Sequence, residues 1–338
     1  MRLVEPLGLL WGRAAHDAVA SGLALPLAGG PAAFTLARLL GGTEGGIVPV
    51  AAIPSEFAEA VENVTCVRPA WAGPVHDRPL VMGILNRTPD SFSDGGVYAD
   101  PAAAIAAGRR MRDEGADILD IGGESTRPGA PEVAADVEQA RVLPVIEALA
   151  GDGMAVSVDT RHAATAAAAL RAGARIVNDV SGFAFDAGLA AVAARHDAAV
   201  VVMHMRGTPE TMQRLTAYRD VAGEVVAELD AAIRRLPMTP ARIVVDPGIG
   251  FAKDTGQNEA LLARLPLLLN LGCRILVGVS RKGFLGRIAG VPDPLARLPG
   301  SLAAGLAAVL GGASILRVHD VAATVQALRV WRAVTDAA

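Results

Sequence analysis

Short, continuous apolar runs alternate with longer Ala- and Leu-rich stretches from residue 79 to the end of the chain. An uninterrupted apolar run predicts a strand that is covered on both faces, as in a parallel sheet, and each longer stretch predicts a crossover helix. The predicted strands span residues 80–85, 118–121, 155–158, 175–177, 199–203, 243–245, 275–279 and 314–316. The predicted helices span residues 101–114, 131–150, 161–172, 187–195, 218–236, 258–269, 295–310 and 321–334.

Eight strand–helix units in about 260 residues match the size of an α/β fold of the (β/α)8 barrel type. A doubly wound open sheet is the alternative architecture. It is disfavoured because the sequence has no glycine-rich dinucleotide fingerprint after a strand. We therefore predict a barrel in residues 76–338.

Residues 1–75 stand outside the repeat and are interpreted as an N-terminal extension of unknown role. Within it the pattern predicts helices at residues 14–21 and 32–40, a strand at 47–53 and a helix at 55–63 that is capped by Ser55. Pro69, Gly73 and Pro74 suggest a linker. The segment carries no chemical motif, so we expect a cap that packs on the barrel.

The composition narrows the class of protein. The chain has 338 residues, of which 52% are hydrophobic and 20% charged, and a net charge of −4. This is typical of a globular protein and gives no sign of a nucleic-acid-binding surface. Proline and glycine interrupt both long uncharged stretches, at 18–37 and 298–316, so we expect no membrane span. We interpret Cys66 and Cys273 as free thiols and place the protein in the cytoplasm.

Hydrogen-bonding side chains follow the predicted strands. In a (β/α)8 barrel these positions line the C-terminal mouth, where the active site lies. A single such residue is more often a helix cap or an ion-pair partner, but polar groups at eight strand ends indicate a common pocket. The candidates are Asn86, Asp120, Glu124, Ser125, Thr126, Arg127, Asp159, Arg161, Asn178, Asp179, His204, Asp246, Ser280, Arg281, Lys282, Arg317 and His319.

These candidates divide into two chemical groups. Asp159, Asn178 and Asp246 provide carboxylates and a carboxamide that suit the hydrogen-bonding edge of a flat heterocycle. Lys282, Arg317 and His319 follow the last two strands, where barrels commonly bind phosphate, and Arg127 could add a contact. The combination predicts transfer of a heterocycle-linked group away from a phosphate leaving group. His204 is as consistent with a packed residue as with a site residue.

Seven motifs in this order resemble the dihydropteroate synthase family over residues 79–334. They are MGILNRTPDSFSDGG (82–96), DILDIGGESTRPGA (117–130), SVDT (157–160), NDVSG (178–182), DPGIGFAK (246–253), SRK (280–282) and RVHD (317–320). The resemblance implies condensation of (7,8-dihydropterin-6-yl)methyl diphosphate with 4-aminobenzoate to give 7,8-dihydropteroate and diphosphate. It also suggests a homodimer.

The resemblance implies a role for each matching position. The pterin would bind Asp159, Asn178, Asp246 and Lys282. The diphosphate would bind Asn86, Thr126, Arg127, Arg317 and His319, with Mg²⁺ held partly by Asn86. Asp90 and Asp94 would stabilise a cationic methylene on the pterin, and Phe92 and Pro128 would flank the aminobenzoate ring. We expect residues 87–96 to form a mobile lid that closes on both substrates.

Two positions depart from the family pattern. Arg87 stands where valine is frequent, so it either adds a cation near the diphosphate or points outward. Gly283 stands where serine is frequent, so only its backbone N–H could contact a carboxylate. Two other functions are alternatives. A methyltetrahydrofolate-type methyltransferase shares the fold and the Asp and Asn residues of the pterin site but would not need the SFSDGG, STRPG and RVHD motifs. The other is a catalytically silent pterin-binding paralogue.

Overall fold

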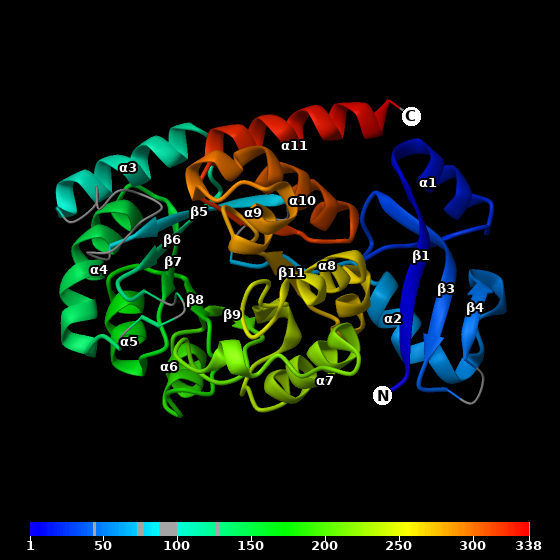
Figure 1. Ribbon diagram of the computed structural model, residues 1–338, viewed down its shortest axis with the longest axis horizontal. Helices are drawn as coiled ribbons and strands as arrows, with labels where there is room; N and C mark the ends of the chain where they lie inside the picture. Colours follow the sequence, from blue (N-terminus) through cyan, green and yellow to red (C-terminus); the bar gives the residue numbers. More distant parts are fainter. Residues whose placement is uncertain are drawn as a thin grey trace.

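Eight parallel strands close into a barrel, which confirms the predicted fold class (Figure 1). The computed structural model describes residues 1–42, 45–72, 78–87, 100–125, 127, 129–130 and 132–337. The strands follow one another around the barrel in sequence order, and the last pairs with the first. They are β5 (Leu80–Asn86), β6 (Ile118–Gly122), β7 (Ala155–Asp159), β8 (Ile176–Asp179), β9 (Ala199–Met203), β10 (Ile243–Asp246), β11 (Arg274–Val277) and β12 (Ile315–Val318).

Helices cover the outside of the barrel close to where the sequence predicts them. Two differences occur in the second half. The stretch predicted at 258–269 divides into α8 (Thr255–Ala263) and a 3-10 helix, η5 (Leu265–Leu271), and an additional helix, α9 (Gly283–Ala289), precedes the predicted helix at 295–310. The barrel helices are α3 (Pro101–Asp113), α4 (Ala135–Gly151), α5 (Ala163–Arg171), α6 (Leu189–Arg195), α7 (Val221–Ile233), α8 (Thr255–Ala263), α9 (Gly283–Ala289), α10 (Leu298–Leu310) and α11 (Val321–Asp336).

The apolar strands divide their side chains between two cores, as the continuous hydrophobic runs require. Met82, Val201 and Leu276 belong to the group that fills the barrel interior. Trp71 joins this group before the first strand, is 3% exposed, and donates its indole N–H to the carbonyl oxygen of Arg242 at 3.1 Å. Trp71 therefore closes the N-terminal end of the barrel and leaves the C-terminal end for chemistry.

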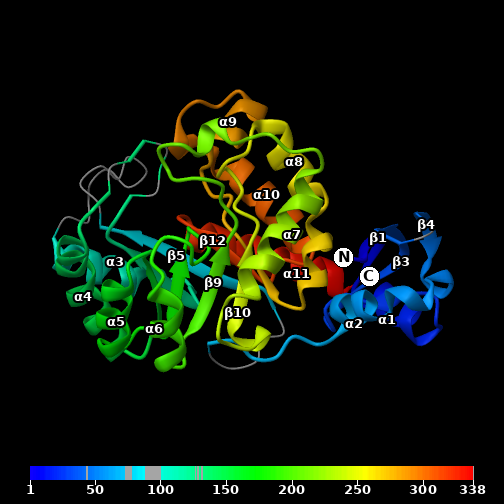
Figure 2. The ribbon, with the colours of Figure 1, turned by 90° about the horizontal axis from the view of Figure 1, so that it is seen from below.

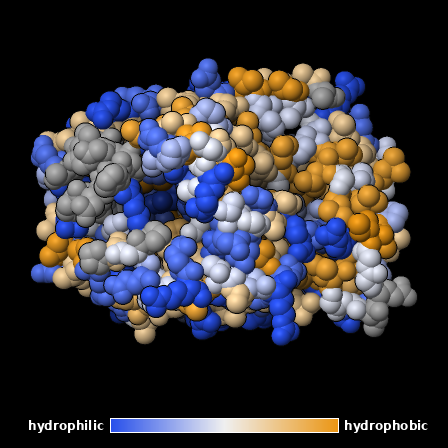
Figure 3. Space-filling model, viewed as in Figure 1, coloured by the Kyte–Doolittle hydropathy of each residue, from blue (hydrophilic) through white to orange (hydrophobic). Residues whose placement is uncertain are grey.

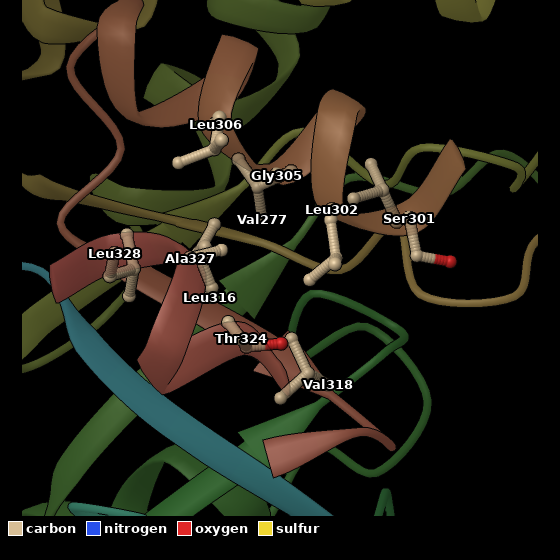
Figure 4. Close-up of a pocket in the computed structure, with 11 residues that line it drawn as sticks. Val277, Ser301, Leu302, Gly305, Leu306, Leu316, Val318, Thr324, Ala327 and Leu328 are labelled. Carbon is tan, nitrogen blue, oxygen red and sulfur yellow. The ribbon is translucent and has the colours of Figure 1, made fainter. Parts of the chain in front are cut away.

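The helix layer packs closely against the strands. Figure 4 shows an apolar cavity among α10, α11 and the neighbouring strands, lined by residues that include Gly305, Leu316 and Leu328. Its volume is only about 10 Å³, which leaves room for at most one water molecule. This part of the barrel is a core and not a ligand site.

The N-terminal residues form a small antiparallel sheet with two helices. Its central strand β3 pairs with β1 on one side and with β2 and β4 on the other. Figure 2 shows this unit at one end of the molecule, beside the end of α11. Its elements are β1 (Leu3–Trp11), α1 (Gly12–Ala20), β2 (Leu25–Pro26), β3 (Ala32–Leu40), β4 (Gly46–Pro49) and α2 (Ala58–Thr65).

The sequence-based prediction was wrong for three parts of this unit. Residues 32–40 form a strand because pairing with β1, which was not predicted, outweighs the helix propensity of their Ala and Leu residues. The strand predicted at 47–53 ends at Pro49, where a 3-10 helix begins. Ser55 makes no side-chain cap, and α2 begins at Ala58. The predicted linker lies largely in residues 73–77, outside the described residues.

Polar contacts fasten the N-terminal unit to the barrel. The side-chain amide of Asn270 accepts from the Val4 N–H at 2.9 Å and donates to the Val4 carbonyl at 2.8 Å, so it replaces a strand neighbour at the edge of β1. Glu5 is 2% exposed and accepts from Arg264 at 2.8 and 3.1 Å and from Arg38 at 2.9 Å. A buried carboxylate needs such partners, so this pairing fixes how the two parts are joined.

The described helices contain no segment with both the length and the apolar character needed to cross a membrane.

We predict that Glu5→Gln lowers the free energy of unfolding by about 2–4 kcal/mol, because Arg264 and Arg38 lose their shared carboxylate. Urea-induced unfolding measures the change. The control is Arg13→Gln, since Arg13 pairs with Asp17 at 3.8 Å and is 80% exposed, and exposed pairs contribute less than about 1 kcal/mol. Equal stability of the two variants would contradict the assigned role of Glu5.

Candidate functional site

Polar side chains meet at the C-terminal mouth of the barrel, where Figure 3 shows a hollow with hydrophilic residues. Strand register places Asn86 beside Gly122, Gly122 beside Asp159, and Asp159 beside Asn178. A Cβ atom on Gly122 would lie 3.3 Å from Oδ1 of Asn86 and 3.6 Å from Oδ2 of Asp159. Glycine at the end of β6 therefore keeps space between the carboxamide and the carboxylate.

Arg317 connects two of these strand ends across the barrel. Its Nε donates to Asp120 Oδ2 at 2.6 Å, and its Nη2 donates to Asp159 Oδ2 at 2.7 Å. Asn178 Nδ2 donates to the same oxygen of Asp120 at 2.9 Å. The structure thus places Arg317 in contact with Asp159, one of the residues predicted to bind the heterocycle. It also identifies Asp120, which the sequence analysis placed at the mouth but gave no role, as the partner that positions both side chains.

The charges of this cluster stabilise one another. Burial raises the pKa of Asp159 above its ordinary value, and the charge of Arg317 opposes that shift. Burial also disfavours the charge of Arg317, but Asp120 and Asp159 outweigh it, so the pKa of Arg317 lies above its usual value. Asp120 is completely buried, and its Oδ1 has no hydrogen-bond partner among the described residues.

Asp246 and Lys282 form a second charged pair at the mouth. Asp246 Oδ1 accepts from the Gly248 N–H at 2.7 Å. Burial raises the pKa of Asp246, and Lys282 opposes the shift. Burial lowers the pKa of Lys282 to about 8, and Asp246 opposes that change. Lys282 Nζ donates to the Ile249 carbonyl and lies 4.7 Å from the ring centre of Phe251.

His319 faces a cationic part of the mouth. Its Nδ1 lies 3.0 Å from Ser280 Oγ, which also accepts from the His319 backbone N–H at 3.2 Å. Burial lowers the pKa of His319 to about 3, and the charges of Arg281, Arg317, Arg127 and Lys282 add to the shift. His319 is therefore neutral at neutral pH, and the predicted cationic residues do share one electrostatic environment.

A buried network behind Asp246 was missed by the sequence analysis. Lys253 is 2% exposed and donates to the carbonyl oxygens of Gly248 at 3.1 Å and Phe251 at 3.0 Å. Its Nζ also lies 2.9 Å from Nδ1 of His204, whose Nε2 lies 3.0 Å from Glu228. Burial lowers the pKa of Lys253 to about 7. His204 is thus a packed residue. The sequence feature that could have indicated this network was Lys253, which lies in the DPGIGFAK motif.

Other mouth candidates stabilise the loops and do not point to a common ligand. Glu124 accepts from Arg161 at 2.7 and 3.0 Å and from the Val133 N–H at 3.0 Å. Asp179 accepts from the backbone N–H groups of Ser181 and Phe183, both at 2.7 Å. These residues fix the chain after β6 and β8.

The structure describes both residues that depart from the family pattern, Arg87 and Gly283. Arg87 is 7% exposed, and its Nη1 donates to the Arg141 carbonyl of α4, so this guanidinium points to the helix layer. Gly283 is the first residue of α9.

Several predicted site residues lie outside the described residues. They are Asp90, Phe92, Asp94, Thr126 and Pro128, together with the lid beyond Arg87.

Comparisons with known proteins agree with the geometry of the mouth. The family described as pterin binding enzyme matches residues 82–319. The dihydropteroate synthase of Synechocystis sp. is 48% identical over 264 residues, which cover 75% of this chain and 91% of that protein. The corresponding Escherichia coli protein is 43% identical over 263 residues and is covered to 93%, with 77% of this chain aligned.

Solved structures agree as well. A Yersinia pestis dihydropteroate synthase with a sulfonamide drug complex has a TM-score of 0.76 and 40% identity, and the match covers 79% of this chain and 99% of that one. A Xanthomonas albilineans dihydropteroate synthase with 7,8-dihydropteroate has a TM-score of 0.68 and 45% identity, covering 76% and 94%. The chain therefore belongs to the pterin-binding enzymes and, within them, to the dihydropteroate synthase family.

Proposed function

We propose that the chain joins (7,8-dihydropterin-6-yl)methyl diphosphate to 4-aminobenzoate and releases 7,8-dihydropteroate and diphosphate. The observation that carries this proposal is the cluster of Asp159, Asn178, Asp246, Lys282 and Arg317 at the mouth of the barrel. Its buried groups are only partly paired, and such groups are costly unless a ligand completes their hydrogen bonds. The X. albilineans relative with bound 7,8-dihydropteroate supports the product class.

The pterin lies against Asp159, Asn178, Asp246 and Lys282 in this proposal. The carboxyl oxygens of Asp159 and Asp246 accept N–H groups from the ring edge, and the Asn178 amide adds a donor and an acceptor. The positive charge of Lys282 opposes the effect of burial, which raises the pKa of Asp246. Phe251 sits beside Lys282 and offers an apolar face to a planar ring.

The diphosphate lies toward Asn86, Thr126, Arg127, Arg317 and His319. A neutral His319 donates or accepts a hydrogen bond there without adding charge. The described residues contain no cluster of three or more His, Cys, Asp or Glu side chains suited to a metal. Asn86 fits a Mg²⁺ ion that takes its remaining oxygen ligands from diphosphate and water, because no side chain at Gly122 crowds its Oδ1. Such an ion would neutralise charge on the leaving group.

The reaction then needs positioning and charge stabilisation. The bond between the pterin methylene carbon and the diphosphate oxygen breaks, and its electron pair leaves with diphosphate. We assign stabilisation of the resulting cationic methylene to Asp90 and Asp94. The amine of 4-aminobenzoate supplies the electron pair of the new C–N bond and loses a proton, while Phe92 and Pro128 flank its ring. We place this activity in the cytoplasm, in a homodimer.

Diphosphate release from the purified protein tests the function. We expect release that depends on the pterin diphosphate, on 4-aminobenzoate and on Mg²⁺, with one dihydropteroate formed for each diphosphate. Folded protein that binds the pterin but forms no product would identify a silent paralogue. Transfer of a methyl group from methyltetrahydrofolate would support the methyltransferase alternative.

We predict that Asp246→Asn weakens binding of a 7,8-dihydropterin by about 100-fold, because hydrogen bonds to a charged group are worth about 1.5–3 kcal/mol each. Isothermal titration calorimetry measures the affinity. The matched control is Asp254→Asn, since Asp254 caps α8 through the Gln257 N–H and asparagine caps equally well. Unchanged affinity in Asp246→Asn would remove Asp246 from the pterin wall.

We predict that His319→Gln makes the protein less sensitive to acid. An unfolded histidine binds a proton near pH 6.5, whereas burial delays protonation of His319 in the native protein to about pH 3. The free energy of unfolding of the parent therefore falls as pH decreases between these values. The variant should lose about 2 kcal/mol less than the parent between pH 6.5 and 4.5 in urea unfolding. Parallel pH curves would show that His319 is accessible to protons.

A further inference from the structure

A second cavity lies at the opposite end of the barrel from the pterin site. Its volume is about 480 Å³, and its lining joins the N-terminal unit to residues that precede β5, β11 and β12 and to the end of α11. These residues stand at the N-terminal ends of the strands, whereas the mouth residues follow the C-terminal ends. Figure 2 shows the N-terminal unit beside the end of α11, and the lining of the cavity includes residues of both. The cavity is therefore separate from the catalytic mouth.

Aromatic and aliphatic side chains line much of the cavity. Trp11 ends β1 and Trp331 lies in α11, and their rings meet edge to face with centres 5.1 Å apart. Leu27 and Val309 add aliphatic surface. A volume in the range of about 300–1,000 Å³ with apolar walls is typical of a small-molecule site. The extension thus contributes about half of a pocket that the barrel alone would not form.

Two arginines in the lining have only uncharged partners among the described residues. Arg68 is 6% exposed and donates to the carbonyl oxygens of Asn63 at 2.5 Å and Leu269 at 3.0 Å and to the Cys66 sulfur at 2.8 Å. Its buried Nε has no partner there. Arg274 donates only to the carbonyl oxygens of Arg68 and Pro69, at 2.9–3.2 Å, and its Nη1 makes no hydrogen bond within the described chain.

The remaining charges of the lining do not neutralise these two arginines. Arg78 pairs with Asp117 at 2.5 Å, and Arg332 pairs with Asp336 at 3.3 Å. Burial lowers the pKa values of Arg68 and of Arg274, and the charge of Arg68 adds to the shift at Arg274. Carbonyl groups at helix ends offset part of the cost, since a helix C-terminus carries roughly half a negative charge. Two guanidinium charges nevertheless share one wall without a carboxylate.

We propose that this cavity binds a small amphipathic anion, with a carboxylate near Arg274 and Arg68 and an apolar body against Trp11 and Trp331. A carboxylate suits this wall because a guanidinium donates to it through two N–H groups in a plane. An aliphatic or aromatic body suits the remaining walls because it removes their apolar surface from water. The inference does not depend on the reaction at the mouth.

Octanoate is the probe that tests the proposal, with 1-octanol as its uncharged counterpart. Isothermal titration calorimetry of the full-length protein should show saturable binding of one octanoate per chain, and 1-octanol should bind at least about tenfold more weakly because it lacks the charge. Arg274→Gln should weaken octanoate binding by about tenfold, whereas Arg274→Lys should retain part of it. Two of the three tryptophans line the cavity, so tryptophan emission should change on binding.

Arg242→Gln is the matched control, because Arg242 precedes β10 at the same end of the barrel but lies outside this lining. Its affinity for octanoate should equal that of the parent. A crystal of the unmodified protein with 8-bromooctanoate locates the ligand independently of any variant, and a bromine peak between Trp331 and Leu27 supports the site. Absence of saturable binding, equal binding of 1-octanol, or bromine only at the barrel mouth would overturn the proposal.

Discussion

The bridge from Arg317 to Asp120 and Asp159 is the interaction on which the catalytic mouth depends. It joins β12 to β6 and β7 and brings one guanidinium to two buried carboxylates. Removing one member of a buried ion pair typically costs about 3–5 kcal/mol, because the other is left uncompensated. In the function that we propose, a bound diphosphate would compete for Arg317, and a pterin would then supply the N–H groups that Asp159 loses.

The remainder of the mouth is organised by backbone geometry around this bridge. Gly122 keeps the space between Asn86 and Asp159 open. Lys253 holds the carbonyl groups of the loop after β10, and this loop offers the Ile249 carbonyl and the Phe251 ring to Lys282. At the other end Trp71 seals the barrel, and the N-terminal unit packs beside it. One fold thus carries a polar mouth and, at its opposite end, a separate cavity.

The barrel could be predicted from the sequence because most of its buried strands are short, mainly apolar runs followed by a polar residue, as at Val245 and Asp246. The sheet of the N-terminal unit could not, because residues 32–40 have helix-forming composition and become a strand only by pairing with β1. Strand-end position predicted that Asp159, Asn178 and Asp246 share a mouth, but not that Asp120 would hold Arg317. Side-chain pairing across the barrel depends on distances that spacing along one chain does not contain.

A crystal structure with the pterin diphosphate bound is the most direct test of this account. The account predicts that the pterin ring edge is hydrogen-bonded to Asp159, Asn178 and Asp246, and that Arg317 has moved at least one N–H from Asp159 to the diphosphate. A bound pterin diphosphate that leaves the Arg317–Asp159 pair intact and makes no contact with Asp246 would contradict it.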